Sequence, residues 1–336
     1  MAVPDPAALL LAALDLRPLG DGEFAASSVP GWSARIFGGQ FLGQSVVAAG
    51  RTVGDGLVVH SLHGYFVRAG DPSLPLRYRV TTLHDGRSFV SRRVEADQDG
   101  ACRFVGLVSF ARPEDGLDYQ PAAELPPVGD ASGLRRYGDW MAETTARPDD
   151  GPEDGDETAA RARPVEVRYV DPPPNGPPNA LPSARLDAPG DEGSEPGDPI
   201  TRPQRMWLRV PGRLPDDPLV HAAALAYASD ETLIDNSMLP HGLRWSDPRL
   251  QGASLDHAMW FCRPAAADRW LLFEQTVVST AGGRGLVHGT LYTPEGELVA
   301  TAMQEGLIRL HGSARPAGAR TGAGPGRLGS GRVRSG

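Results

Sequence analysis

Residues 38–53 read GGQFLGQSVVAAGRTV, in which 41–53 are rich in alanine, valine and leucine and follow the glycine pair Gly38-Gly39. This composition predicts a helix over 41–53. Beyond it, apolar and strand-forming residues recur in short runs, which two turn signals separate, Asp85-Gly86-Arg87 and Asp99-Gly100. The runs predict strands at 58–68, 76–83, 88–98 and 103–110. The first part of the chain is therefore expected to form one helix and an antiparallel meander.

The second part of the chain repeats this scheme. An alanine-rich run predicts a helix over 219–228, and extended segments follow at 254–263, 270–279, 286–292 and 298–309. Turn signals separate them at Gly282-Gly283 and Glu295-Gly296. The two parts can be superposed at nearly constant spacing, which indicates a duplicated unit. The matched residues are Tyr65-Phe66-x-Arg68 with Trp260-Phe261-x-Arg263, Gly86-Arg87 with Gly283-Arg284, and Gly100 with Gly296.

A helix wrapped by an antiparallel sheet is the hotdog unit, so the sequence predicts an α+β double hotdog. The first unit is expected at 1–112 and the second at 205–311, since fusing two copies pairs sheet edges that would otherwise be exposed. Residues 113–204 are predicted to be an acidic linker and insertion, rich in proline and glycine, with a short strand near 165–170 that belongs to the second unit. Such composition buries little apolar surface, so we expect a mobile insertion and a disordered tail at 312–336.

Composition excludes several kinds of chemistry. The chain of 336 residues has a formal net charge of -9, which does not favour a nucleic-acid partner. Its 33 basic residues are all arginine, so a lysine Schiff base and a phosphate-loop lysine are excluded. The two cysteines, Cys102 and Cys262, lie in apolar runs and are interpreted as small buried residues.

Membrane and export signals are also missing from the sequence pattern. No apolar run approaches the roughly 20 residues of a membrane-spanning helix. Residues 7–14 are apolar but lack a basic start and a cleavage site, so they are interpreted as a first helix packed on the domain. A cytoplasmic location is expected.

Common catalytic signatures are absent: there is no Gly-x-Ser-x-Gly elbow, no His-Glu-x-x-His and no dinucleotide glycine fingerprint. His60 and His63 lie three apart in a predicted strand, so they are expected on opposite faces and unable to share a metal. We therefore expect no metal, no cofactor and no covalent nucleophile.

Three polar residues of the second unit could orient a water molecule instead. Asp230 ends the predicted helix, Ser254 opens a strand, and Gln304 lies in the last strand on one face with Ala300, Ala302 and Gly306. A carboxylate with neighbouring polar groups can deprotonate and place a water. The spacing alone favours the structural roles that such residues usually have, a capping or surface aspartate, a turn serine and a structural glutamine.

Several motifs, in the right order in both halves, resemble the TesB-like acyl-CoA thioesterase II family. The resemblance covers most of 5–120 and 205–310. The motifs are RIFGGQxxGQ at 35–44, HSLHGYFVRAGD at 60–71, DGRSFxxRRV at 85–94, YASD at 227–230, LDHAMWF at 255–261 and QEGLIR at 304–309.

The resemblance implies the double-hotdog fold and hydrolysis of acyl-CoA to free acid and coenzyme A. It also implies a catalytic trio, which in this sequence is Asp230, Ser254 and Gln304, with serine where many family members have threonine. Serine lacks the methyl group that restricts the threonine rotamer. A backbone amide near the central helix is expected to stabilise the oxyanion. One site per chain is expected, because the first unit's last strand offers Val108 and Ser109 in place of Gln304. A homo-oligomer is also expected.

Two alternatives keep the fold. The chain could bind acyl thioesters without cleaving them, as a carrier or regulatory module. It could also be a hotdog hydratase with a catalytic histidine, for which His257 beside Asp256 is the candidate pair. Adjacent strand residues face opposite ways, so this pair fits poorly.

Overall fold

The computed structural model describes residues 5–28, 35–123, 125, 131–137, 163–171, 203–245 and 247–311. Most of the predicted insertion, including 172–202, and the tail at 312–336 lie outside the described residues.

The described residues of the first half form two helices and six strands, and these elements follow the predicted order. They are α1 (Pro6–Leu14), β1 (Arg17–Gly20), β2 (Glu23–Ala26), α2 (Gly38–Gly50), β3 (Val58–Phe66), β4 (Leu76–Asp85), β5 (Phe89–Gln98) and β6 (Ala101–Ala111).

The second half adds a helix, a 3-10 segment and the remaining strands, after a short 3-10 turn, η1 (Ala131–Gly133). They are β7 (Glu166–Tyr169), β8 (Gln204–Arg209), α5 (Pro218–Ser229), η3 (Ile234–His241), β9 (Leu250–Ser254), β10 (Asp256–Phe261), β11 (Leu271–Ala281), β12 (Arg284–Tyr292) and β13 (Leu298–Leu310). Strand β7 pairs with β8, at the edge of the second half of the sheet.

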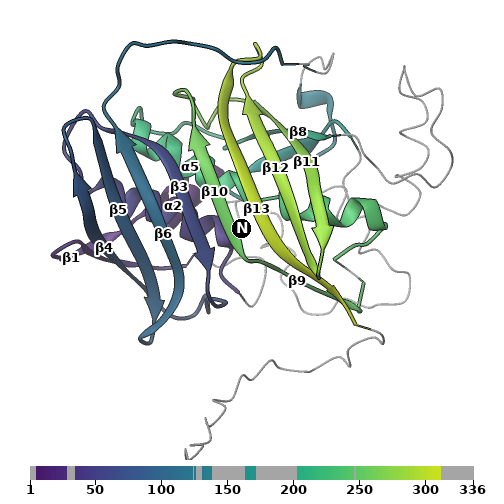
Figure 1. The fold of residues 1–336 in the computed structure, drawn as a ribbon, viewed down its shortest axis with the longest axis horizontal. Coiled ribbons are helices and arrows are strands. Elements are labelled where there is room, and N and C mark those ends of the chain that lie inside the picture. The colour runs from purple at the N-terminus through teal and green to yellow at the C-terminus, as the bar shows by residue number, and fades with distance from the viewer. Residues whose placement is uncertain are drawn as a thin grey trace, which may run out of the picture.

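The strands of the described residues join one antiparallel sheet in the order β1-β2-β4-β5-β6-β3-β10-β13-β12-β11-β8-β7, with β9 added beside β13 (Figure 1). The two halves meet where β3 pairs with β10, with His63 opposite Ala258. The sheet edges that each unit would expose alone are therefore joined within the chain. The expected double hotdog is confirmed.

Helices α2 and α5 lie together against one face of the sheet (Figure 1). Small residues bring them close: a Cβ atom added to Gly43 would lie 2.9 Å from the Ala223 carbonyl oxygen, and one added to Gly39 would lie 2.3 Å from that of Tyr227. Both helices are buried along most of their length because the sheet curves around them. The contact places the C-terminal end of α5 beside the N-terminal end of α2.

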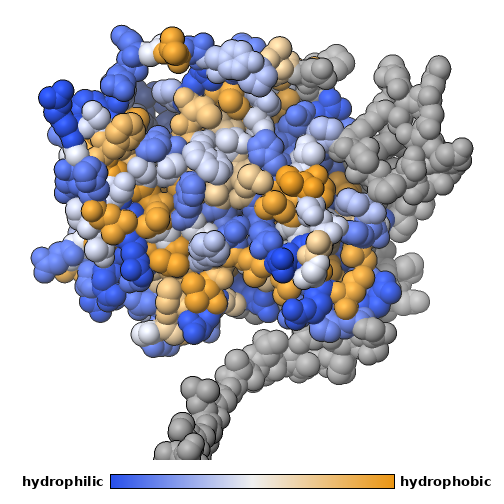
Figure 2. Space-filling model, in the orientation of Figure 1, coloured by the Kyte–Doolittle hydropathy of each residue, from blue (hydrophilic) through white to orange (hydrophobic). Residues whose placement is uncertain are grey.

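The strands alternate between this buried face and an outer face. Phe104, Phe110 and Phe273 are fully buried, whereas Tyr65 and Trp260 are exposed. Figure 2 shows apolar patches among polar residues on the outer face of the central strands. The alternation is the period-2 pattern of strands that have one buried face and one outer face.

Several expectations need correction. The central helix begins at Gly38, not at 41, and β1, β2, β9 and η3 were not predicted. The cysteines are not buried: Cys102 is half-buried and Cys262 is exposed, because each lies near a strand end at the border of the core.

The prediction that His60 and His63 lie on opposite faces is wrong. The β3–β6 register shifts between Val59 and Ser61, and this bulge at His60 adds one residue between the faces. His60 consequently bonds to outward-facing Ser109 at 2.9 Å, while His63 packs edge-on against exposed Trp260. Neither ring turns to the core.

Candidate active site

The structure brings Asp230, Ser254 and Gln304 together from three separate segments. Asp230 is the C-terminal cap residue of α5, Ser254 ends β9, and Gln304 lies on β13. The Gln304 side-chain Nε2 donates to Asp230 Oδ1 and to Ser254 Oγ, the latter at 3.0 Å. The amide therefore joins the carboxylate and the hydroxyl in one hydrogen-bonded group.

A bulge in the sheet sets the position of Ser254. Ser254 pairs with Gly306 on β13, but the register changes by one at Leu255 before Ala258 pairs with Met303. Ser254 therefore ends one strand and does not open the next, which corrects the predicted strand at 254–263. Gln304, two residues before Gly306, is its diagonal neighbour on the same face.

The small residues of β13 have a structural reason. A Cβ atom added to Gly306 would lie 2.3 Å from the Ile234 side chain in η3. Part of the space that the small residues leave is thus filled by the chain's own η3 segment.

The N-terminal end of α2 meets the carboxylate of Asp230. The cap residue Phe37 provides no side-chain hydrogen bond to α2, and the Gly39 N–H donates to Asp230 instead. A Cβ atom on Gly38 would lie 2.5 Å from Asp230 Oδ2. The glycine pair thus lies within the helix and does not precede it, and it allows the carboxylate and the α5 backbone to approach closely.

Burial controls the charge of Asp230. The residue is only 7% exposed, and burial raises the pKa of its carboxyl to about 7. Donation from Gln304 and from the Gly39 N–H lowers this pKa, and the nearby Asp235 carboxylate raises it. A carboxyl that titrates near neutrality is suited to take a proton from water and to release it again.

Two more buried acids surround Asp230, and sequence reasoning missed both. Burial raises the pKa of Glu231 to about 8 and that of Asp235 to about 7. Arg163 lies 3.6 Å from Glu231, and the Trp245 indole N–H donates to Asp235 at 2.7 Å. The adjacent acids Asp230-Glu231 after an apolar helix were the available sequence signal.

The first half of the chain lacks this trio. His63 on β3 and Ala258 on β10 lie opposite each other where the two halves join. On the other side of each strand, His63 pairs with Leu107 of β6, and Ala258 pairs with Met303 of β13. Leu107 and Met303 are therefore equivalent, and so are the residues that follow them, Val108 and Gln304. Val108 is buried. Ser109, which faces outward, is not the counterpart of Gln304.

The same register places Val59 at the position of Ser254, because Val59 pairs with Phe110 as Ser254 pairs with Gly306. Helix α2 ends at Gly50 without a carboxylate. Buried Arg92 binds this end instead, donating to the Thr52 carbonyl at 3.0 Å and to its hydroxyl at 2.9 Å. A cation at a helix C-terminal end is favourable, so the contacts of Arg92 stabilise this end of α2.

The histidine pair considered for hydratase chemistry does not form. The Asp256 carboxylate accepts from the Glu305 N–H at 2.8 Å, whereas buried His257 bonds to Ser229 at 2.9 Å. The two side chains face opposite ways, as expected from their adjacency in a strand.

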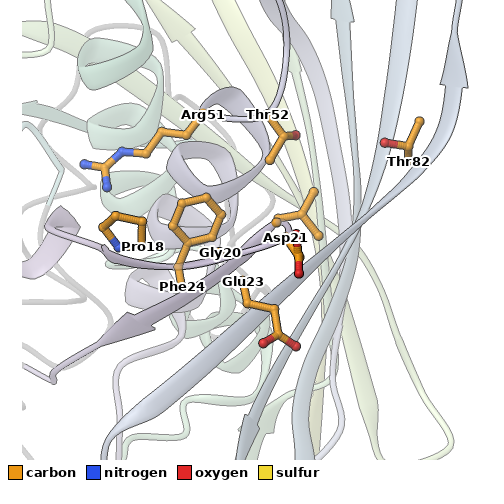
Figure 3. A pocket seen from close by; sticks show the side chains of 10 residues that line it. Pro18, Gly20, Asp21, Glu23, Phe24, Arg51, Thr52 and Thr82 are labelled. Atoms are coloured by element: carbon orange, nitrogen blue, oxygen red, sulfur yellow. The ribbon is translucent and has the colours of Figure 1, made fainter.

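A hollow of about 490 Å³ lies elsewhere, beside the β1–β2 hairpin (Figure 3). It is lined by residues of that hairpin, by Arg51 and Thr52 after α2, and by Thr82. No member of the trio lines it. Among the described residues, no group of three or more metal-ligating side chains is found, and no helix is long and apolar enough to span a membrane.

Two family models match the chain. The acyl-CoA thioesterase N-terminal domain matches residues 28–111, and the acyl-CoA thioesterase model matches residues 189–307. Acyl-coenzyme A thioesterase 8 of Mus musculus is 35% identical over 322 residues, covering 90% of this chain and 89% of that protein. Acyl-CoA thioesterase 2 of Haemophilus influenzae is 31% identical over 302 residues, covering 89% and 96%.

A solved acyl-CoA thioesterase structure is also similar to this chain. The acyl-CoA thioesterase II TesB2 of Mycobacterium marinum superposes with a TM-score of 0.67 at 37% identity, covering 91% of this chain and 99% of that one.

Proposed function

Because this chain belongs to the TesB-like acyl-CoA thioesterase II family and is a thioester hydrolase, we propose that Asp230, Ser254 and Gln304 use a bound water to hydrolyse acyl-CoA. The products are a free acid and coenzyme A.

The observation that supports this proposal is the Gln304 amide, whose nitrogen is shared by the Asp230 carboxylate and the Ser254 hydroxyl. The three groups come from a helix end and two strands, and the equivalent strand positions in the first half are valines. Burying a carboxylate and an amide is costly unless they are hydrogen-bonded. A catalytic role of the second half accounts for these polar side chains where the first half has valines.

In the proposed reaction, Ser254 and Gln304 hold a water molecule beside the thioester carbon. Ionised Asp230 takes one of its protons as the water oxygen forms a bond to that carbon. The carbon–sulfur bond then breaks, and the proton held by Asp230 passes to the departing thiolate. Atoms and charge balance without a covalent enzyme intermediate.

The oxyanion of the intermediate is proposed to lie at the N-terminal end of α2. Unsatisfied backbone N–H groups at a helix start favour negative charge. The Gly39 N–H donates to the Asp230 carboxylate, so this helix end faces the reacting groups. An oxyanion donor of this kind typically contributes about 10²–10³ in rate.

The proposal is tested by thiol release from a panel of acyl-CoA substrates of different chain lengths. Asp230→Asn is expected to lower kcat by roughly 10²–10⁴-fold with folding intact, the usual range for a lost general base. Asp256→Asn is the control, because that carboxylate is half-buried nearby and bonds only to the Glu305 backbone N–H among the described contacts.

For the unmodified protein, kcat/KM should rise as the pH increases through about 7, where Asp230 loses its proton. A chain that only binds acyl thioesters would release no thiol at any pH. Near-native turnover by Asp230→Asn would remove Asp230 from the mechanism.

The cytoplasmic location and the homo-oligomeric assembly stay predictions. Light scattering during size-exclusion chromatography measures the assembly directly.

A further inference from the structure

His257 lies next to the candidate site on the buried face of β10 and is 1% exposed. On β10 and β13, Ala258 pairs with Met303. His257 precedes Ala258 and Gln304 follows Met303, so in these antiparallel strands His257 lies beside Gln304, on the face that covers the end of α5. Two neighbouring side chains of the sheet thus contact two consecutive residues of that end: Gln304 bonds to Asp230, and His257 bonds to Ser229.

The hydrogen bonds determine which imidazole nitrogen carries the proton. The Ser229 hydroxyl donates its hydrogen to the Ala226 carbonyl at 2.9 Å, so it must accept from His257 Nε2 at 2.9 Å. His257 Nε2 therefore carries a hydrogen. Its Nδ1 is buried without a hydrogen-bond partner in the described part of the chain, which fits a neutral ring. Burial also lowers the pKa of His257 to about 3.

The first half shows what this position holds when no site is present. The β3–β10 pairing is symmetric about His63 and Ala258, so Leu62 is the counterpart of His257, as Val108 is of Gln304. Leu62 and Val108 are both fully buried. The first half, which has no site here, thus has leucine and valine in its core at these two positions. The second half replaces both by polar side chains that bond to the same helix end.

We infer that His257 is a positioning residue, whose Nε2–H holds Ser229 and thereby fixes the last turn of α5 so that Asp230 points to Gln304. This inference rests on the proposed function. His257 does not contact the reacting groups itself. It acts on the direction of the carboxylate, and misplacement of a reacting group by about 1 Å can cost on the order of 10²-fold in rate.

The test compares His257→Leu, which copies the first half, with His257→Gln, whose side-chain amide can place an N–H donor near the position of Nε2. His257→Leu is expected to lower kcat by roughly 10- to 100-fold, with KM changed less than about twofold. His257→Gln should recover most of this loss. Ser229→Ala should lose as much as His257→Leu, and the double variant should lose no more than either single variant, because both remove the same hydrogen bond.

His288→Leu is the matched control. His288 is a half-buried histidine on β12 that bonds to the Thr301 hydroxyl at 2.6 Å, so the change removes a similar hydrogen bond away from α5. Its kcat is expected to stay within about twofold of the unmodified protein. Circular dichroism and melting temperature are measured for every variant. If His257→Leu does not fold, Ser229→Ala and His257→Gln decide the question.

The inference is overturned if His257→Leu or Ser229→Ala turns over like the unmodified protein while Asp230→Asn is inactive. It is also overturned if the two losses add in the double variant, or if His257→Gln is as slow as His257→Leu. Failure of the proposed function looks different, because Asp230→Asn would then keep its turnover.

Discussion

The substitution Gln304→Val introduces the residue type that the first half has at the equivalent position, Val108. The substitution removes the Nε2 donor to the Asp230 carboxylate and to the Ser254 hydroxyl. Loss of the side chain that positions the reacting groups can cost on the order of 10²-fold in rate, or roughly 2.7 kcal/mol of transition-state stabilisation.

A second effect adds to the first. Donation from Gln304 lowers the pKa of Asp230, so its loss raises that pKa further above the usual range. A smaller fraction of the protein then has an ionised base at neutral pH, and the rise of kcat/KM with pH should move to higher pH. The loss of kcat should therefore be larger at pH 7 than at pH 9.

Stability should change less than activity. A hydrogen bond to a charged group contributes about 1.5–3 kcal/mol, and Asp230 can take up a proton when its donor is lost. We expect Gln304→Val to lower the free energy of unfolding by less than about 3 kcal/mol, as measured by urea denaturation.

The assay is thiol release from pH 5 to 9 over acyl-CoA concentrations from well below KM to saturation, which gives both kcat and kcat/KM. Ser109→Ala is the control on the equivalent strand of the first half, because its hydroxyl bonds to His60 at 2.9 Å outside the site. Its turnover should be unchanged. Equal losses from both variants, with both folded, would refute the model of one site per chain, and a folded Gln304→Val with near-native kcat would refute the role of the amide.

Two further predictions concern the surroundings of Asp230. The pKa of Glu231 is 4.5 in the unfolded reference and about 8 when buried, so its ionisation opposes folding, and the stability present below pH 4.5 is lost as the pH rises toward 8. Glu231→Gln should therefore reduce the fall in unfolding free energy between pH 5 and 8 by up to about 1.4 kcal/mol per pH unit; an unchanged slope in urea titrations would contradict this. Gly38→Ala should lower kcat roughly tenfold or more, since its Cβ would lie 2.5 Å from Asp230 Oδ2 and 3.1 Å from the Phe66 ring. Gly54→Ala is the control, because no atom lies within 4 Å of its added Cβ, and equal activity of the two variants would show that the carboxylate tolerates the methyl group.

Much of the fold follows from local pattern. The helix over 219–228 and the strands that flank Asp85-Gly86-Arg87 and Gly282-Gly283 are formed by residues whose spacing and turn chemistry act over a few positions. The repeat of that pattern was sufficient to predict two units joined in one sheet. The start of the first helix does not follow from local pattern: Gly38 and Gly39 precede the predicted helix, because what requires glycine there is a contact with α5 from far along the chain.

The candidate residues were identified from sequence, but their grouping was not. Asp230, Ser254 and Gln304 were selected by chemical type and by resemblance, and only the folded chain shows the amide donating to both partners. The acids Glu231 and Asp235 were missed, since burial raises their pKa values and burial is a property of the packed sheet and helices.

The amino-acid sequence by itself determined the order of the elements, the duplication and the residue types able to activate water. Tertiary structure decided which face each side chain occupies. A strand side chain changes face at every residue, so one inserted residue reverses the prediction. The bulges at His60 and Leu255 are two such insertions. The pairing of His257 with Ser229 likewise depends on how β10 lies over the end of α5, because hydrogen bonds between distant segments depend on packing and leave no periodic signal along the chain.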